Sequence, residues 1–178
     1  LAATFDDNAV YTTFDMVSDE ARAKYHQYQK NKEYDRYKGL TFWTPNINIF
    51  RDPRWGRGME TYGEDPYLTA RMGVAVVKGL QGNNPDYFKT HACAKHYAVH
   101  SGPEWSRHEF NAVATPRDLY LTYLPAFKAL VEEADKIGCN FIQFTADLLD
   151  RKGAVELLMW LLSDKEYAEH DRLILINN

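Results

Sequence analysis

The chain lacks the sequence features of several classes of protein. No apolar run approaches the roughly 20 residues that a bilayer-spanning helix needs, so we expect no membrane segment. Lysine and arginine form no basic stripe, and a net charge of −4 gives no electrostatic basis for nucleic-acid binding. The first residues do not have the charged and apolar regions of a signal peptide, so we expect the chain to start inside a domain.

Cysteine is scarce, and its spacing excludes the common metal-binding patterns. Cys93 and Cys139 each lie in an apolar, strand-like run, without CxxC or Cys/His spacing. The histidines His91, His108 and His170 show no ligand spacing either. Buried free thiols are the favoured interpretation of the two cysteines, with a disulfide as the alternative. The sequence therefore implies no metal and no organic cofactor.

The chain does have the composition and the periodicity of one globular α/β domain. It has 178 residues, of which 45% are hydrophobic and 26% charged, which is enough for one core and argues against disorder. Alternating strands and helices imply parallel pairing with right-handed crossovers. The predicted strands are 40–43, 47–50, 90–96 and 139–145, and the predicted helices are 15–37, 65–82, 115–130 and 153–162.

The helix at 65–82 has the clearest signals at both ends. Asp65 can cap its first turn, Pro66 suits the first helical position, and Gly82 suits a residue just beyond the last turn. Thr115 is placed to cap the later helix in the same way.

Two motifs hold most of the chemistry. The first is RDPRWGRGMETYGEDP at 51–66, and the second is AKHYAVHSGPE at 94–104. Each follows an apolar run and places basic side chains among glycines, aromatic residues and carboxylates, as in a polar-ligand pocket at the ends of strands. The Arg57 guanidinium can bind sugar hydroxyls or a carboxylate. The alternative is that Arg57 pairs within its own loop, with Glu60, Glu64 or Asp65.

Lys95 and His96 are adjacent residues at the end of a predicted strand. Neighbouring strand residues point to opposite faces, so both can reach one ligand only where the chain leaves the sheet. The alternative is a Lys/His pair satisfied by buried carboxylates. For His100 and Glu104, a substrate contact and a surface turn set by Gly102 and Pro103 remain equally open.

Together the two motifs resemble the N-terminal (β/α)8 domain of family 3 glycoside hydrolases, the β-glucosidases and β-xylosidases, over residues 1–134. A complete barrel needs roughly 250 residues, so the resemblance implies a partial TIM-barrel-like domain. Residues 135–178 do not align with the family, and we expect this segment to pack on the same domain. In that arrangement the run 139–145 pairs beside 90–96, and the helix 153–162 covers the open edge.

The resemblance also implies roles for the residues of both motifs. Arg57 resembles the arginine that binds the sugar at subsite −1, and Lys95 and His96 resemble the pair that hydrogen-bonds to the substrate hydroxyls. Arg51 and Arg54 have no such counterpart, and we expect them to hold the loop to neighbouring carboxylates. His96 would act as a hydrogen-bonding group and not as a general base. His100 and Glu104 lie in the HSGPEW loop, which lines the pocket mouth in the xylosidase-like branch.

The implied activity is the retaining hydrolysis of terminal, non-reducing β-D-glucosyl or β-D-xylosyl residues from oligosaccharides or aryl β-glycosides. A retaining mechanism needs two carboxyl groups about 5–5.5 Å apart. The S-D-C and S-D-W forms of the family nucleophile are absent, and the acid/base glutamate typically comes from a second domain. Asp147 is the one weak nucleophile candidate, and a helix cap is the better interpretation of it. We therefore expect this chain alone to be inactive or nearly so.

Two alternatives to catalysis remain open, a non-catalytic carbohydrate-binding fragment and a purely structural one. The choice between glucoside and xyloside also stays open, although a bulky Trp105 near the pocket mouth favours xyloside modestly. The family resemblance implies a periplasmic or extracellular location.

Overall fold

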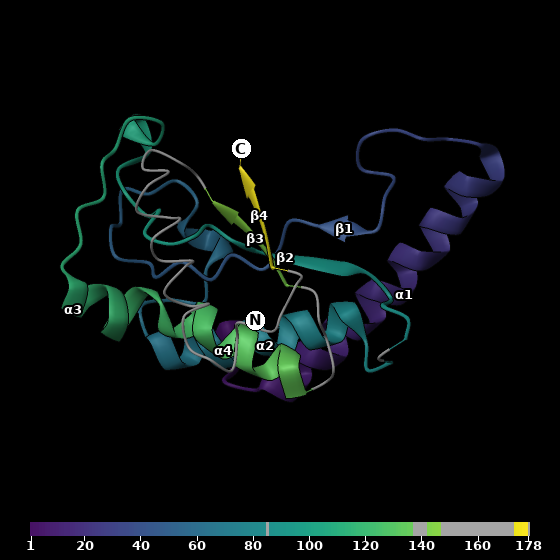
Figure 1. The fold of residues 1–178 in the computed structure, drawn as a ribbon, viewed down its shortest axis with the longest axis horizontal. Coiled ribbons are helices and arrows are strands. Elements are labelled where there is room, and N and C mark those ends of the chain that lie inside the picture. Colours follow the sequence, from purple (N-terminus) through teal and green to yellow (C-terminus); the bar gives the residue numbers. More distant parts are fainter. Residues whose placement is uncertain (85, 137–141, 147–172, 178) are drawn as a thin grey trace.

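The computed structural model describes residues 1–84, 86–136, 142–146 and 173–177, and it has an open, all-parallel α/β sheet. Its four described strands follow one another in chain order across the sheet (Figure 1). They are β1 (Thr41–Phe42), β2 (His91–Lys95), β3 (Ile142–Ala146) and β4 (Leu173–Asn177). The predicted α/β class is confirmed.

The centre of the sheet is the pairing of β2 with β3. Cys93 lies opposite Gln143 and Lys95 opposite Thr145, so the run predicted at 139–145 does pair beside the run at 90–96. β4 pairs with β3 on the other side, which the sequence did not indicate. The helix predicted at 153–162 lies outside the described residues.

Helix α1 (Asp7–Asn31) begins and ends earlier than the predicted 15–37. The Asp6 side chain caps it by accepting a hydrogen bond from Ala9 N at 2.9 Å. At its other end Lys32 adopts a left-handed conformation with φ of 57°, and its backbone N–H bonds back into the last turn. The helix therefore stops without the glycine that the prediction relied on, Gly39.

Helix α2 (Pro66–Gln81) has the bounds that its local signals predict. The Asp65 carboxylate accepts a hydrogen bond from Leu68 N at 2.6 Å, and Gly82 follows the helix with φ of 75°. α2 contacts α1, α4 and β2. Because it is covered on these sides, its apolar residues supply much of the core, including Met72, Val76 and Leu80.

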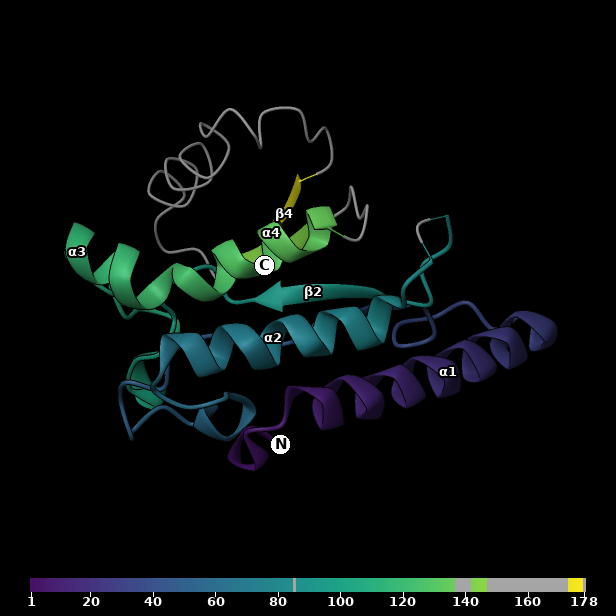
Figure 2. The same ribbon diagram turned by 90° about the horizontal axis from the view of Figure 1, so that it is seen from below.

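The helices form a layer on one face of the sheet. α2 and α4 contact one another and lie below β2 in the view of Figure 1, and Figure 2 shows α1 along the side of α2 that faces away from α4. Gly79 marks the closest approach of α1 and α2, since a Cβ there would lie 2.6 Å from a backbone oxygen of α1. Ser18 Oγ donates to the Gly79 carbonyl oxygen across the same contact, at 3.1 Å.

The helix predicted from Thr115 is present but interrupted. Thr115 caps the short helix α3 (Pro116–Asp118), and a π-helical turn, Leu119–Tyr123, separates it from α4 (Pro125–Lys136). Pro125 explains the interruption because it has no N–H to donate and its ring excludes a carbonyl from the preceding turn. α4 places Phe127 in the core, fully buried.

The segment predicted as a strand at 47–50 is not one. Asn46 makes a single bridge with Lys95, and Ile47 N donates to Lys95 O at 2.9 Å. Beyond that point the Asn48 side chain, rather than its backbone, bonds to the backbone at His96 and Ala98. The ladder therefore ends after one residue. In the described part of the chain, no helix is long and apolar enough to cross a membrane.

Candidate functional site

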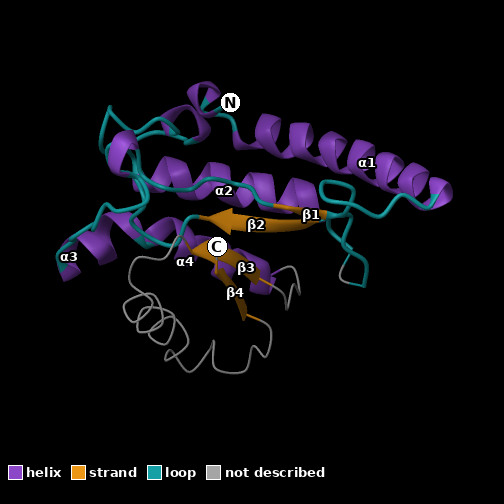
Figure 3. Cartoon of the chain, turned by 90° about the horizontal axis from the view of Figure 1, so that it is seen from above, coloured by secondary structure: helices purple, strands orange, loops and turns teal. Residues whose placement is uncertain are grey.

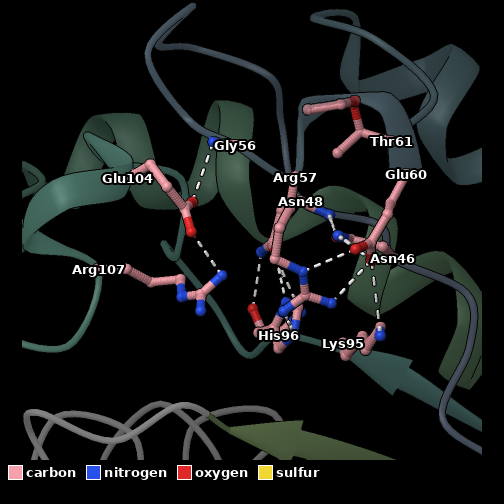
Figure 4. Close-up of polar contacts among 11 residues, drawn as sticks. Asn46, Asn48, Gly56, Arg57, Glu60, Thr61, Lys95, His96, Glu104 and Arg107 are labelled. Carbon is pink, nitrogen blue, oxygen red and sulfur yellow. Dashed lines mark hydrogen bonds and ion pairs between the residues drawn. The ribbon is translucent and has the colours of Figure 1, made fainter.

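The structure brings Arg57, Lys95 and His96 together at the carboxyl end of β2. Lys95 is the last residue of the strand and His96 follows it. The loops that carry the two motifs gather at this end (Figure 3). Arg57 lies on the first of these loops, and its Nη1 is 2.9 Å from His96 Nε2 (Figure 4). The convergence predicted from the strand end is therefore observed, and the role of these residues in binding sugar stays a prediction.

Glu60 links the two cations of the site. Its carboxylate accepts from Arg57 Nε at 2.7 Å and from Arg57 Nη2 at 2.8 Å, and it lies 3.6 Å from Lys95 Nζ. Asn46 Nδ2 also donates to it at 3.4 Å. The pairing of Arg57 with Glu60, one of the two interpretations of the sequence, is present. It coexists with the contact to His96 and does not replace it.

The pKa values of Glu60 and Lys95 are both lowered, for different reasons. Hydrogen bonds from Arg57, aided by the charges of Arg57 and Lys95, lower the pKa of Glu60 from 4.5 to about 2. Burial lowers the pKa of Lys95, and the charge of Arg57 lowers it further. A carboxylate held ionised in this way is poorly suited to donate a proton near neutral pH. The arrangement provides hydrogen-bond donors for a polar ligand, with Glu60 holding them in place.

His96 is a buried, neutral imidazole. His96 is only 3% exposed to solvent. Burial lowers the pKa of His96 to about 2, and His100, Arg57 and Lys95 add to the effect. Its Nδ1 lies 3.0 Å from Asn48 Oδ1. His96 therefore contributes hydrogen bonding at Nε2 and no charge near neutral pH.

Asn46 and Asn48 are two site residues that the sequence analysis missed. Both are buried, and both contact residues of the candidate site. The signal was available in the alternation N-I-N-I at 46–49, where Ile47 and Ile49 are buried in the core. An extended segment with asparagine at every second position places those amides together on one face.

His100 and Glu104 have different surroundings from one another. The His100 ring lies against His96 with centroids 4.3 Å apart, and it meets Trp55 edge-on at 5.6 Å. Glu104 accepts a hydrogen bond from Gly56 N at 3.0 Å and pairs with Arg107 at 2.7 Å. Glu104 thus joins the second motif to the loop of Arg57. A direct substrate contact for either residue stays a prediction.

The other arginines of the first motif hold its loop in two ways. Arg54 forms two hydrogen bonds with the Asp52 carboxylate, at 2.9 and 2.8 Å, as predicted. Arg51 was also expected to pair with a carboxylate, and this is wrong. It donates to the Ser101 carbonyl oxygen at 2.6 Å and lies between the rings of Phe110 and Tyr123. A guanidinium can stack on aromatic faces, so it needs no carboxylate there.

Two candidates from the sequence analysis remain, Asp147 and Trp105. Asp147 lies outside the described residues. Trp105 is 83% exposed on a short turn after Pro103. Among the residues that the structure describes, no group of three or more histidine, cysteine, aspartate or glutamate side chains could hold a metal ion.

Comparison with known proteins places this chain in a family. Residues 18–147, more than half of the chain, match the N-terminal domain of glycosyl hydrolase family 3. The chain is 50% identical over 171 residues to a xylan 1,4-beta-xylosidase of Xylanibacter ruminicola, covering 93% of this chain and 20% of that protein. It is 42% identical over 151 residues to beta-xylosidase/alpha-L-arabinofuranosidase 2 of Medicago sativa subsp. varia, covering 80% and 18%.

Solved structures agree with this assignment. The chain is similar to a beta-glucosidase from Listeria innocua in complex with glucose, with a TM-score of 0.70 and 29% identity over 99% of this chain and 23% of that one. The chain thus spans about a fifth of the length of the curated relatives that it matches. Its open parallel sheet corresponds to part of a (β/α)8 domain. The chain belongs to glycosyl hydrolase family 3, as part of the N-terminal domain of that family.

Proposed function

We propose that Arg57, Lys95 and His96 bind the terminal sugar in a family 3 β-glycosidase that removes non-reducing β-D-xylosyl or β-D-glucosyl residues with retention. The observation that supports this is their convergence at the carboxyl end of β2, with Arg57 Nη1 2.9 Å from His96 Nε2 and Glu60 between Arg57 and Lys95. Two cations and a neutral imidazole provide hydrogen-bonding groups for adjacent sugar hydroxyls. Ligand sites in α/β barrels lie at this end of the strands.

A β-D-xylosyl residue is the first substrate to test. Both curated relatives above are named as β-xylosidases, and one matches at 50% identity over 93% of this chain. The solved relative is a beta-glucosidase in complex with glucose, so glucose is the matched comparison ligand. Because the chain spans about a fifth of its curated relatives, sugar binding is tested first and hydrolysis second.

Calorimetric or NMR titration with D-xylose, methyl β-D-xyloside and D-glucose tests binding. We expect saturable binding that weakens by at least about tenfold in Lys95→Ala and in His96→Ala, since each change removes a hydrogen-bonding group. Lys24→Ala, an exposed lysine of α1, is the control and should bind as the wild type does. Saturable binding that is equal in all four proteins would place the sugar elsewhere. The absence of heat and of chemical-shift change would refute binding at this site.

Hydrolysis of p-nitrophenyl β-D-xyloside separates catalysis from binding alone. A non-catalytic carbohydrate-binding role is the second candidate, because Glu60 is ion-paired with Arg57 and Lys95. Binding without turnover by this chain would agree with that role. Robust turnover that is abolished by Asp147→Asn would instead assign the nucleophile to Asp147.

A further inference from the structure

The orientation of the Asn48 amide is determined by backbone groups. Asn48 has 2% exposure, and its Nδ2 lies 2.7 Å from the His96 carbonyl oxygen and 2.9 Å from the Ala98 carbonyl oxygen. Its Oδ1 lies 2.8 Å from the backbone nitrogen of His96. Carbonyl oxygens only accept and a backbone N–H only donates, so the amide nitrogen must face the carbonyls and the amide oxygen must face the N–H.

The same amide oxygen is 3.0 Å from His96 Nδ1. An amide oxygen only accepts, so Nδ1 must have the proton. On the other side of the ring, Nε2 is 2.9 Å from Arg57 Nη1, and a guanidinium nitrogen only donates. Nε2 must therefore be without a proton. Two neighbours of known polarity thus select one of the two neutral tautomers of His96.

We propose that Asn48 is a positioning residue that holds His96 in the Nδ1–H tautomer, so that the single lone pair of Nε2 accepts from Arg57 Nη1 and holds this guanidinium in place for the ligand. The proposal deepens the proposed function and rests on it, since the ligand is taken to be a sugar. Arg57 and Lys95 supply hydrogen-bond donors to the sugar oxygens, and His96 fixes the position of Arg57 by accepting from its Nη1.

The tautomer itself is tested without any sugar. Long-range ¹H–¹⁵N spectra of this chain, labelled at histidine, distinguish a protonated from a bare imidazole nitrogen, and His96→Gln identifies the signals of His96. We expect a protonated Nδ1 and a bare Nε2 throughout the neutral pH range. A protonated Nε2, or an equal mixture of tautomers, would overturn the proposal. The wild-type spectrum decides this even where a variant does not fold.

Asn48→Asp tests the part played by the amide. The substitution places a carboxylate beside Nδ1, which favours the imidazolium, as the charge of Glu60 already does. The charges of Arg57 and Lys95 and the ring of His100 act in the opposite direction. We expect His96 to gain a second proton within the accessible pH range and sugar affinity to fall at least about tenfold. Gln81→Glu makes the same change at another buried amide, which bonds to Ala92 N, and should leave the His96 signals unchanged.

The outcomes separate this proposal from the proposed function. A bare Nε2 in the wild type together with a shifted titration in Asn48→Asp supports the positioning role, even where no sugar binds and the proposed function fails. Sugar binding that is lost in His96→Ala but unchanged in an Asn48→Asp variant whose His96 titration has shifted would overturn the positioning role toward the ligand and leave the proposed function standing. An unchanged His96 titration in a folded Asn48→Asp would also overturn it.

Discussion

The Glu60 carboxylate should stabilise the folded chain in a pH-dependent way that Glu60→Gln removes. Glu60 accepts two hydrogen bonds from Arg57 and lies 3.6 Å from Lys95. Glutamine preserves the shape but loses the charge, and its NH₂ group has to face one of the two cations. Arg57 and Lys95 would then repel one another without the carboxylate between them.

The size of the effect follows from the pKa of Glu60. Its fall from 4.5 to about 2 would correspond to about 3 kcal/mol for a group shielded from solvent. The Glu60 side chain is 37% exposed, so solvent screening reduces the expected contribution to about 1–2 kcal/mol. Because the pKa is lower in the folded state, this stability is fully present above about pH 4.5. It is lost as the pH falls toward 2.

Urea unfolding of the wild type and of Glu60→Gln, followed by circular dichroism between pH 7 and pH 2.5, measures this contribution. We expect the variant to be about 1–2 kcal/mol less stable at pH 7 and the difference to shrink below about pH 4.5. Glu20→Gln, an exposed glutamate of α1, is the control and should show little difference at any pH. A difference that stays constant down to pH 2.5 would show that shape, not charge, is responsible. No difference at pH 7 would refute the ion-pair argument.

Three further predictions concern the packing of the chain. Phe127 is fully buried and meets Tyr97 edge-on, with ring centroids 4.9 Å apart. Phe127→Ala should therefore lower the free energy of unfolding in urea by about 3–5 kcal/mol, and a loss below about 1 kcal/mol would contradict the assigned core. Gly79→Ala should cost about 1–3 kcal/mol because its Cβ meets the α1 backbone at 2.6 Å, whereas Gly39→Ala, with nothing within 4 Å, should unfold as the wild type does. Deleting residues 153–178 removes β4 and exposes the edge of β3, so light scattering should show aggregation of the shortened chain. A shortened chain that stays monomeric and unfolds cooperatively would show that β4 is not needed to cover this edge.

Features specified by neighbouring residues could be predicted from the sequence. Asp65, Pro66 and Gly82 determine both ends of α2, because each acts on backbone groups within one turn of itself. The run at 90–96 becomes β2 because continuous apolar residues are buried on both faces of a parallel sheet. The end of that strand places Lys95 and His96 at one point, which follows from the period of a strand and needs no tertiary information.

Features that depend on residues far apart in the chain were decided only by the tertiary structure. α1 ends at a left-handed lysine, Lys32, where the sequence pattern continues to favour a helix toward Gly39. Arg51 finds a carbonyl oxygen and two aromatic rings in place of the expected carboxylate, because its partners come from segments 50 or more residues away. Local propensity contains no information about such partners.

The candidate site shows the same division most clearly. The sequence alone identified Arg57, Lys95 and His96 as candidates to hold a sugar, through their residue types, the strand end at Lys95 and the resemblance of the two motifs to family 3 glycoside hydrolases. Only the tertiary structure showed that Glu60 holds both cations and that Asn48 bonds to both the backbone and the ring of His96. The reason is physical. The protonation state and tautomer of a buried side chain depend on burial and on the polarity of its neighbours. Folding brings Arg57 and Asn48 to His96, although they lie 39 and 48 residues from it in the sequence.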